Sequence, residues 1–265
     1  MKNVLDNHYW DSIVEKIDNR IFEKNVAVYY KSEHIQLIKK WGEGLKGKKI
    51  LKTDLFEEAF KDGDFLFWLL RQNENTFGMD ISCAIVKKAR DNSRELNFKF
   101  DKGIASDIRN CAFGDESFDL IISNSTLDNL SFGDVSGALG ELRRILKPKG
   151  ILILTLDNRN NPLYYLGYLI EKIIKTNKYY QARCYSRSDI EVLAKQNNFL
   201  IKDTTAIVHI PTPFNKIALF LGRFGGKPAQ KFIRWCVISF SKLGYKKTKF
   251  FTGWFIAVKL IKNNA

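Results

Sequence analysis

The sequence predicts an α/β fold in which one mostly parallel sheet is covered by helices on both faces. Three observations lead to this prediction. From residue 49 onward, short apolar runs alternate with segments that have helical spacing, and the apolar runs are nearly continuous. Strands that are buried on both faces have this continuous apolar character, and alternation with helices is typical of parallel sheets. The third observation is size, because 265 residues with 45% hydrophobic side chains can bury one large core or two small ones.

The elements follow in chain order from the spacing of apolar residues. Residues 5–45 have helical spacing, which ends at the glycines that begin with Gly42. The expected strands are 49–53, 76–80, 103–107, 118–124, 151–156, 199–209 and 254–261. The expected helices are 57–72, 83–92, 134–146, 188–197 (capped by Ser186 or Ser188), 215–223 and 228–243, with a further inserted helical segment at 158–185.

Acidic residues follow four of the expected strands. They are Asp54, Asp80, Asp107 and Asp128. A single acid after a strand is usually a turn or cap residue. Ligands of parallel sheets, however, bind beyond the carboxyl ends of the strands, so several acids along this edge indicate a binding site. The loop after the first strand contains none of the glycines that normally let a backbone approach a nucleotide closely.

Three segments of the chain resemble class I S-adenosylmethionine-dependent methyltransferases of the type 11-like kind. They are GMDIS (Gly78–Ser82), ASDIRNCAFGDESFDLIISNSTLDNL (Ala105–Leu130) and ELRRILKPKGILILTLDN (Glu141–Asn158). The resemblance covers roughly residues 45–210. It implies a Rossmann-like, doubly wound, seven-stranded sheet with N-terminal helices and a helical cap. It also implies a helical extension at 1–47 and a methyltransferase domain at 48–265, with cap insertions at about 158–185 and 211–250.

The first motif departs from the family pattern. The chain reads KTDLFEEAF (Lys52–Phe60) where the family usually has an acid followed by three alternating glycines. This stretch is similar to a glycine-free variant loop of a subgroup of bacterial methyltransferases. Two interpretations follow. Either the variant loop binds the methionine end of the cofactor by different contacts, or the chain keeps the fold without the activity.

The resemblance implies S-adenosylmethionine as the cofactor, and Asp80 takes the family's ribose-binding position. The residues expected to bind the cofactor are Thr53, Asp54, Leu55, Phe56, Asp80, Ile81, Asp107, Ile108, Ser123, Asn124 and Ser125. Because the sulfonium already activates the methyl group, the protein mainly has to align a nucleophile and exclude water.

An oxygen nucleophile often also needs a base, and three residues are candidates. Asp128 and His209 are the predicted catalytic residues, and Asp157 is a third candidate. Asp128 faces the methyl group in the family geometry, although it could equally cap the following helix. His209 lies at a strand end, where a structural role is the alternative.

These observations predict a methyltransferase that modifies oxygen on a small-molecule, glycan or lipid-linked acceptor. An RNA methyltransferase and a catalytically inactive scaffold are the alternatives. The four cysteines are far apart and the three histidines are scattered, so we expect reduced thiols in a cytoplasmic protein and no metal site. No apolar run approaches the ~20 residues of a membrane span, and the N-terminus lacks the apolar core of a signal peptide. No feature of the sequence indicates an oligomeric state.

Positive charge is concentrated near the C-terminus. The net charge is +14, and the stretch Thr204–Ala265 contains eleven lysines or arginines and no acid. Its helices combine cations with Trp235 and Phe240, so we expect peripheral binding to the anionic inner membrane face. The cations expected to make this contact are Lys216, Arg223, Lys227, Lys231, Arg234, Lys242, Lys246, Lys247 and Lys249. The alternatives are a helical lid over the substrate and, with less support because no RNA module is recognisable, a nucleic-acid surface.

Overall fold

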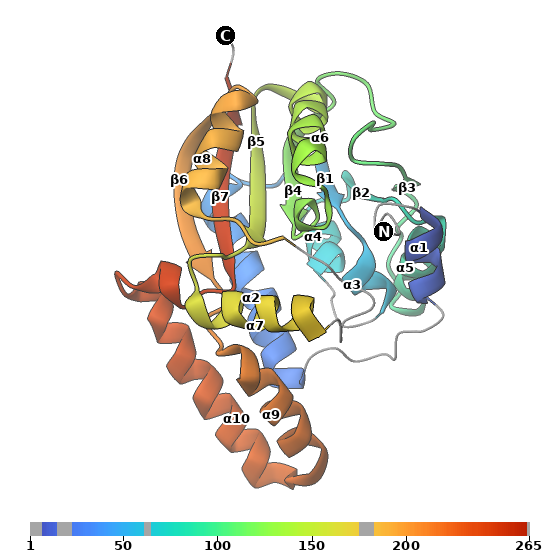
Figure 1. The fold of residues 1–265 in the computed structure, drawn as a ribbon. Helices are drawn as coiled ribbons and strands as arrows, with labels where there is room; N and C mark the ends of the chain where they lie inside the picture. The colour runs from blue at the N-terminus through green and yellow to red at the C-terminus, as the bar shows by residue number, and fades with distance from the viewer. Residues whose placement is uncertain (1–6, 15–22, 61–64, 175–182, 264–265) are drawn as a thin grey trace.

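The computed structural model describes residues 7–14, 23–60, 65–174 and 183–263, and these residues form one seven-stranded sheet (Figure 1). The strand order is β3-β2-β1-β4-β5-β7-β6, with β1 to β5 parallel and β7 antiparallel to both β5 and β6. The strands are β1 (Ile50–Thr53), β2 (Thr76–Asp80), β3 (Gly103–Ala105), β4 (Phe118–Asn124), β5 (Leu146–Asp157), β6 (Phe199–Ile207) and β7 (Phe255–Lys262). The predicted Rossmann-like α/β sheet is therefore confirmed.

Helices cover both faces of the sheet. Apolar side chains of α6 (Phe132–Ile145) and α8 (Arg187–Gln196) pack on one face. On the other face lie α2 (Lys24–Trp41), α4 (Phe65–Gln72), α9 (Thr212–Phe224) and α10 (Gly226–Ser241). A third cluster joins α3 (Phe56–Ala59), α4 and α5 (Cys83–Glu95) and lies against β2 and β3. The remaining helices are α1 (Asn7–Val14), α7 (Pro162–Ile174) and the short 3-10 turns η1 (Leu127–Asn129), η2 (Lys242–Tyr245) and η3 (Lys249–Phe251).

The N-terminal helices are built into this core. Helix α2 buries Val26, Ile38 and Trp41 in the same cluster as Ile50 of β1, and the Trp41 indole donates to Asp203 at 2.9 Å. Helix α1 packs on α5. The helical spacing of residues 5–45 thus corresponds to two helices, and residues 15–22 lie outside the described ranges. The division of the chain between residues 47 and 48 stays a prediction.

Several boundaries differ from the predicted ones for local reasons. The single helix expected at 57–72 is two helices, because the Glu58 carboxylate accepts from the Leu66 amide and so satisfies the start of α4. Strand β5 begins at Leu146 instead of 151, since Phe118 pairs with Leu146 while Leu120 pairs with Ile151, and the residues between them bulge outward.

Two further strands are shorter than expected, and one predicted cap is settled. Strand β3 ends before Asp107 because that side chain closes a turn, and β6 ends before Val208, which has a φ of +60°. Of the two serines proposed as the cap of α8, Ser186 is the cap, in a reciprocal capping box with Asp189.

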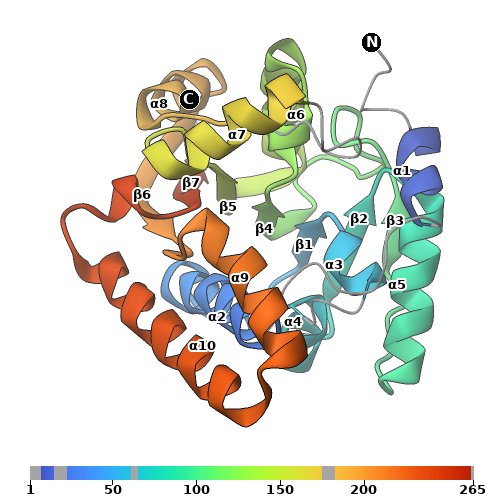
Figure 2. The ribbon, with the colours of Figure 1, turned by 60° about the horizontal axis from the view of Figure 1, so that its bottom comes forward.

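The carboxyl ends of the parallel strands lie at one end of the molecule. Figure 2 shows this end facing the viewer, with α3, α7 and α9 around the arrowheads of β1, β2, β4 and β5. The strand order reverses between β1 and β4, which pair side by side. In open α/β sheets this switch point is where ligands bind.

Candidate active site

The loop after β1 makes a left-handed turn although it contains no glycine. Asp54 has a φ of +84°, a conformation that costs a residue with a side chain about 1 kcal/mol or more. Three hydrogen bonds stabilise the turn: the Asp54 amide donates to Met79 O (2.6 Å), the Phe56 amide donates to Asp54 Oδ1 (2.7 Å), and Lys52 Nζ donates to Asp54 O (2.5 Å). The variant loop therefore obtains by hydrogen bonding the turn that glycine adopts without strain.

A buried ion pair holds this loop against α4. Lys52 Nζ lies 2.9 Å from Glu58 Oε2, and both side chains are almost completely buried. The second carboxylate oxygen of Glu58 accepts from the Leu66 amide. Burial by itself lowers the pKa of Lys52, but the negative charges of Glu58 and Asp54 outweigh it and hold the pKa above its ordinary value. Lys52 is therefore a permanently charged support of the loop.

Removing one partner of this pair should destabilise the fold strongly. We expect Lys52→Met to lower the free energy of unfolding by about 3–5 kcal/mol, because Glu58 would remain as an uncompensated buried charge. The double variant Lys52→Met/Glu58→Gln should recover much of this loss, since the amide oxygen can still accept from Leu66. Urea unfolding of the three proteins measures the difference. Equal losses in the single and double variants would contradict the buried-charge explanation.

Asp80 is held rigidly at the end of β2. Its carboxylate accepts from the Leu55 amide at Oδ2 and from the Ser82 amide at Oδ1, both at 2.9 Å, and the residue is 8% exposed. Burial and then the charge of Asp54 raise the pKa of Asp80 to about 7. Each oxygen keeps a second lone pair, so the carboxylate can also accept from a ligand hydroxyl. Ile81, the next residue, is half-buried.

The side chains around Asp80 come from several elements. Leu55 is buried against β2, where its side chain would lie 2.7 Å from a Cβ at Gly78. Phe56 packs edge-on against Trp10 of α1, with ring centroids 6.1 Å apart. Ser82 donates to Asp11 of the same helix. Helix α1 therefore lies directly beside the residues expected to bind the cofactor.

Asp107 is not a free acid. Arg109 binds both of its carboxylate oxygens, with Nη2–Oδ2 at 2.6 Å, and its amide donates to Oδ1 at 2.8 Å. Burial raises the pKa of Asp107, but the hydrogen bonds from Arg109 outweigh it and lower the pKa below its usual value. Ile108 is buried in the core cluster that contains Met79. A direct role of Asp107 or Ile108 in cofactor binding stays a prediction.

The loop after β4 contains polar atoms without partners. Thr53 Oγ1 lies 3.0 Å from both Ser123 Oγ and Thr126 Oγ1, which ties β1 to β4 at the switch point. Within the described ranges, Asn124 Oδ1 and Ser125 Oγ are buried and have no hydrogen-bond partner. Buried polar atoms rarely stay unpaired, so these atoms fit a polar ligand such as the expected cofactor.

Asp128 is the most unusual carboxylate of the site. It is fully buried, and no described residue makes a hydrogen bond of good geometry to either carboxylate oxygen. Burial, and then the charge of Asp157, raise its pKa well above the ordinary value. The Asp157 amide and the Ser125 hydroxyl lie near enough to lower the pKa, but they do not outweigh these two effects. The alternative role as a helix cap is wrong, because Ser131 caps α6 and its hydroxyl accepts from the Asp134 amide. Asp128 is instead positioned to bind something that donates a proton or a hydrogen bond.

Asp157 and Tyr185 lie near Asp128, and we call these three residues the polar cluster. Asp157 ends β5 and is 3% exposed, and burial raises its pKa to about 7. Tyr185 is buried with its hydroxyl unpaired within the described part of the chain, and burial and the charge of Asp128 raise its pKa. Hydrogen bonds between the Tyr185 amide and Asp157 O, and between the Arg183 amide and Asp128 O, bring these segments together. No pattern in the sequence marks Tyr185 as a site residue. Asp157 could be recognised as one because it lies at the end of a strand, like the other acids.

His209 has a different environment. Its Nδ1 lies 2.8 Å from Thr252 Oγ1 and its Nε2 lies 3.1 Å from Ala206 O, so both ring nitrogens have partners within the fold. Burial lowers its pKa. These contacts favour a structural role for His209. Its predicted catalytic role is not tested by any observation.

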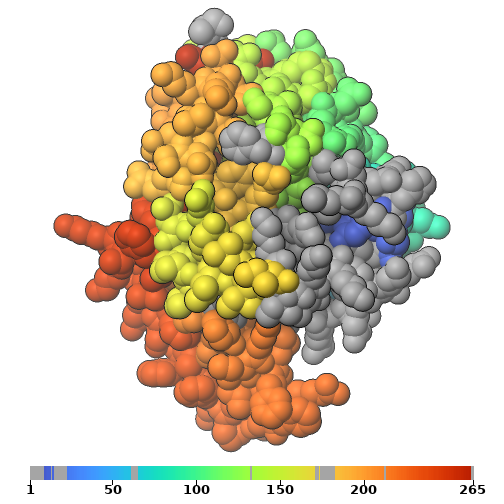
Figure 3. Space-filling model, viewed as in Figure 1, coloured from blue at the N-terminus to red at the C-terminus, as the bar shows by residue number. Residues whose placement is uncertain are grey.

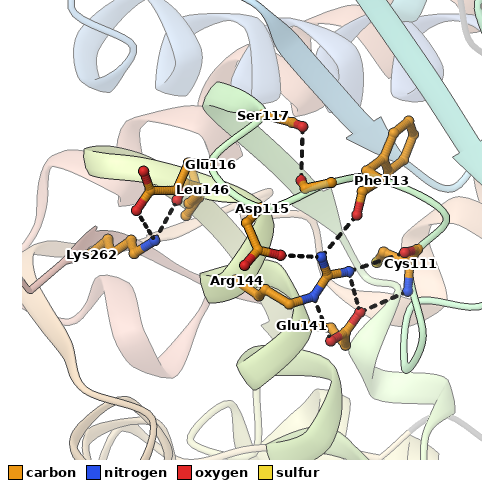
Figure 4. Close-up of polar contacts among 10 residues, drawn as sticks. Cys111, Phe113, Asp115, Glu116, Ser117, Glu141, Arg144, Leu146 and Lys262 are labelled. Atoms are coloured by element: carbon orange, nitrogen blue, oxygen red, sulfur yellow. Dashed lines mark hydrogen bonds and ion pairs between the residues drawn. The ribbon is translucent and has the colours of Figure 1, made fainter.

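A surface cavity of about 480 Å³ lies at the opposite end of the sheet. It borders Arg144 of α6, which binds Glu141, Asp115 and the carbonyls of Cys111 and Phe113 (Figure 4). Lys262, on the same cavity, donates to Leu146 O and contacts Glu116. These charges already have partners in the chain, and the cavity is remote from the strand ends that hold Asp80 and Asp128. Among the described residues no group of three or more His, Cys, Asp or Glu is arranged to hold a metal ion.

Sheet topology and strand-end acids define a class I methyltransferase, and the comparison with known families agrees. Residues 62–209, more than half of the chain, match the family described as "Methyltransferase domain", and the chain belongs to this family. Solved structures that share this fold include S-adenosylmethionine-dependent methyltransferases. The matched residues begin after the glycine-free loop.

Individual relatives are distant. The chain is 27% identical over 156 residues to the "Uncharacterized protein MJ1252" of Methanocaldococcus jannaschii, a match that spans 56% of this chain and 57% of that protein. The solved structure of a "possible histamine N-methyltransferase" from Thermotoga maritima has a TM-score of 0.62 and 19% identity, covering 97% of this chain and 99% of that one. Magnesium protoporphyrin IX methyltransferase from Synechocystis, solved with bound S-adenosylhomocysteine, has a TM-score of 0.60 and 14% identity, covering 97% and 93%. At these identities the structures establish the fold alone.

Proposed function

We propose that the protein transfers a methyl group from S-adenosylmethionine to a hydroxyl oxygen of a small-molecule, glycan or lipid-linked acceptor, with Asp128 as the base. The observation that carries this proposal is the fully buried Asp128 carboxylate at the end of β4, to which no described residue makes a hydrogen bond of good geometry. It lies next to the switch point, where the cofactor of an α/β sheet binds.

The residues divide into a binding group and a reacting group. Asp80 would hold the ribose, and the free polar atoms of Asn124 and Ser125 would bind the methionine end, beside the turn at Asp54. When bound, the cofactor supplies a methyl group that its sulfonium already activates. The protein therefore has to position the acceptor and remove its proton.

Asp128 and Asp157 suit the proton-removing step. Two carboxylates buried together do not readily ionise together, and the pKa of Asp128 is raised further than that of Asp157, so Asp157 loses its proton first as the pH increases. Burial makes Asp128 a stronger base than an exposed carboxylate. Asp128 would accept the hydroxyl proton once it has itself ionised, so the rate of methyl transfer should rise with pH.

Calorimetric titration with S-adenosylmethionine and S-adenosylhomocysteine tests the cofactor site first. We expect both to bind; failure of both would support the inactive scaffold. Methyl-labelled S-adenosylmethionine is then incubated with aqueous, lipid and RNA fractions of a cell extract. Label in an alkali-stable ether of the aqueous or lipid fraction supports the proposal, whereas label only in RNA supports the RNA methyltransferase.

Cofactor affinity should depend on pH through Asp80. The ionised carboxylate accepts ribose hydroxyls well, and its pKa in the free protein is raised to about 7. Below this value the group is protonated, so the affinity for S-adenosylhomocysteine should rise as the pH increases from about 6 to about 8. Asp80→Asn cannot ionise and should bind more weakly, with a smaller pH dependence. Identical pH profiles for the two proteins would contradict this role of Asp80.

A further inference from the structure

Three helices present apolar side chains to the outside of the molecule. Each set recurs at three- and four-residue intervals, so its members share one face of their helix. The exposed residues are Leu163, Leu166, Ile170 and Ile173 on α7, Ile217, Phe220 and Phe224 on α9, and Phe232, Trp235 and Ile238 on α10, with exposures between 45% and 79%. We call these residues the apolar face.

The helices that carry the apolar face lie at one end of the molecule. Figures 1 and 2 show α7, α9 and α10 at the end where the parallel strands terminate, and Figure 3 shows α9 and α10 in the lower part of the molecule with α7 above them. Helix α9 contacts both α7 and α10. The carboxyl ends of β4 and β5, which Asp128 follows and Asp157 ends, lie at the same end of the molecule as the apolar face.

The hairpin of α9 and α10 is fixed in place by its inner side. Ala218 of α9 and Ile233 of α10 are fully buried in the core. Asn25 of α2 donates to the Gln230 side chain at 2.7 Å. The two aromatic residues that the sequence analysis grouped with the cations differ in the structure. Phe240 packs inward, with its ring centroid 5.3 Å from that of Phe214, while Trp235 is 64% exposed. The apolar face is thus additional to the core.

Cations accompany the apolar side chains of α9 and α10, whose segment has no acid, whereas α7 carries Glu171 and Lys172. Eight of the nine cations expected to contact a membrane are exposed: Lys216, Arg223, Lys227, Lys231, Arg234, Lys242, Lys246 and Lys247. Lys249 differs, because its Nζ binds Thr205 Oγ1 at 2.9 Å. The segment from Thr204 onward has no acid. Glu23, which lies next to Gly222, is 5% exposed and uses its carboxylate to cap α2.

The charge and the apolar side chains of this face together indicate which kind of partner binds it. Aromatic and aliphatic side chains beside lysine and arginine are typical of helices that lie in the interface of an anionic bilayer. A second copy of the chain would bring the same positive charges together, which is unfavourable. Nucleic acid would explain the cations but leaves the leucine and isoleucine stripe of α7 exposed to water. None of the described helices combines the length and apolarity needed to cross a bilayer.

We propose that the apolar face of α7, α9 and α10, with its cations, docks on the surface of an anionic membrane such as the cytoplasmic leaflet. Docking would direct the strand ends toward the bilayer. If the proposed methyl transfer holds, the acceptor group is then presented by a lipid-linked molecule at the membrane surface. The docking itself does not depend on methyl transfer.

Vesicle co-sedimentation of the full chain tests the proposal. The protein should pellet with vesicles of phosphatidylcholine and phosphatidylglycerol, remain in the supernatant with phosphatidylcholine alone, and be released as salt shortens the Debye length from about 10 Å at 0.1 M to about 3 Å at 1 M. The triple variant Lys227→Glu/Lys231→Glu/Arg234→Glu should lose about a hundredfold or more in vesicle affinity. Equal pelleting with both vesicle types would overturn the charge argument, and no pelleting with either would overturn the proposal.

A matched control carries the same change in net charge away from the apolar face. Lys87, Lys149 and Lys195 are exposed on α5, on the β5 bulge and on α8, and their replacement by Glu should reduce vesicle affinity much less. Both triple variants should keep the S-adenosylhomocysteine affinity of the parent, which separates failure of docking from failure of the cofactor site. Equal losses of vesicle affinity in the two triple variants would mean that net charge alone causes binding.

Trp235 reports whether its side chain enters the bilayer. Trp41 and Trp254 are buried at 2% and 6% exposure and Trp10 and Trp68 are half-buried, whereas Trp235 is 64% exposed. Adding anionic vesicles should therefore shift the tryptophan emission to shorter wavelength, and Trp235→Phe should remove most of that shift while the protein still pellets. A full shift in Trp235→Phe would exclude insertion of this helix. Salt-sensitive RNA binding without vesicle binding, or a concentration-dependent dimer lost in the Glu triple variant, would assign the face to those partners instead.

Discussion

Asp128→Asn should lower kcat by about a hundred- to ten-thousand-fold while the affinity for S-adenosylhomocysteine stays unchanged. General base catalysis contributes a factor of this size, and the amide of Asn cannot accept a proton at neutral pH. The substitution preserves the size of the side chain and removes a buried carboxylate whose oxygens accept no hydrogen bond of good geometry from the described residues. The variant should therefore fold at least as stably as the parent. The measurement pairs methyl incorporation into the acceptor fraction with calorimetric titration.

Asp157→Asn is the companion variant for this prediction. It removes the second carboxylate, whose charge helps to raise the pKa of Asp128. The acid limb of the pH–rate profile should therefore move to lower pH, with a smaller loss of kcat than in Asp128→Asn. If Asp157→Asn removes activity and Asp128→Asn retains it, Asp157 is the base. If both variants keep full activity, the polar cluster takes no part in proton removal.

Asp80→Ala should weaken the binding of S-adenosylmethionine and S-adenosylhomocysteine by about a hundredfold or more. A hydrogen bond to a charged group contributes about 1.5–3 kcal/mol, and the ribose offers two hydroxyls. The substitution also removes the acceptor for the Leu55 and Ser82 amides, so the loops after β1 and β2 lose a shared support. Calorimetric titration measures the affinity of each ligand.

Asp107→Ala provides a comparison with a second strand-end acid. Arg109 already occupies the Asp107 carboxylate, so we expect a smaller loss of affinity than in Asp80→Ala. Unchanged affinity in Asp80→Ala would show that the ribose binds elsewhere. A larger loss in Asp107→Ala would transfer the principal binding role to that residue.

Much of the fold could be predicted because strands and helices leave local patterns. Strand β4 is a continuous apolar run because it is buried on both faces, and its predicted bounds, 118–124, match the observed ones. The Ser186 cap could also be predicted, because it is formed with Asp189, only three residues along the chain. Positions of acids at strand ends follow from the same patterns, which is why Asp54, Asp80 and Asp128 could be placed along one edge of the sheet.

The partner of each polar side chain could not be predicted in the same way. Asp107 and Asp80 follow neighbouring strands and look equivalent in the sequence, yet Arg109 binds one while backbone amides of two loops bind the other. The glycine-free loop gave no sign that Lys52 would be buried, because a lysine on a strand is ordinarily exposed. Trp235 and Phe240 are both aromatic residues of one helix, and only the packing of α10 on the core distinguishes them.

The sequence by itself determined the order and type of the elements, the family resemblance, and the row of acids at the strand ends. These depend on apolar spacing and on neighbours a few residues apart. The tertiary structure decided that Asp128 and Asp157 are buried together, that Asp54 adopts its turn with the help of Lys52, and that the apolar side chains of α7, α9 and α10 remain uncovered. Burial and charge pairing are set by all the groups that surround a side chain, and those groups come from strands and helices far apart in the chain.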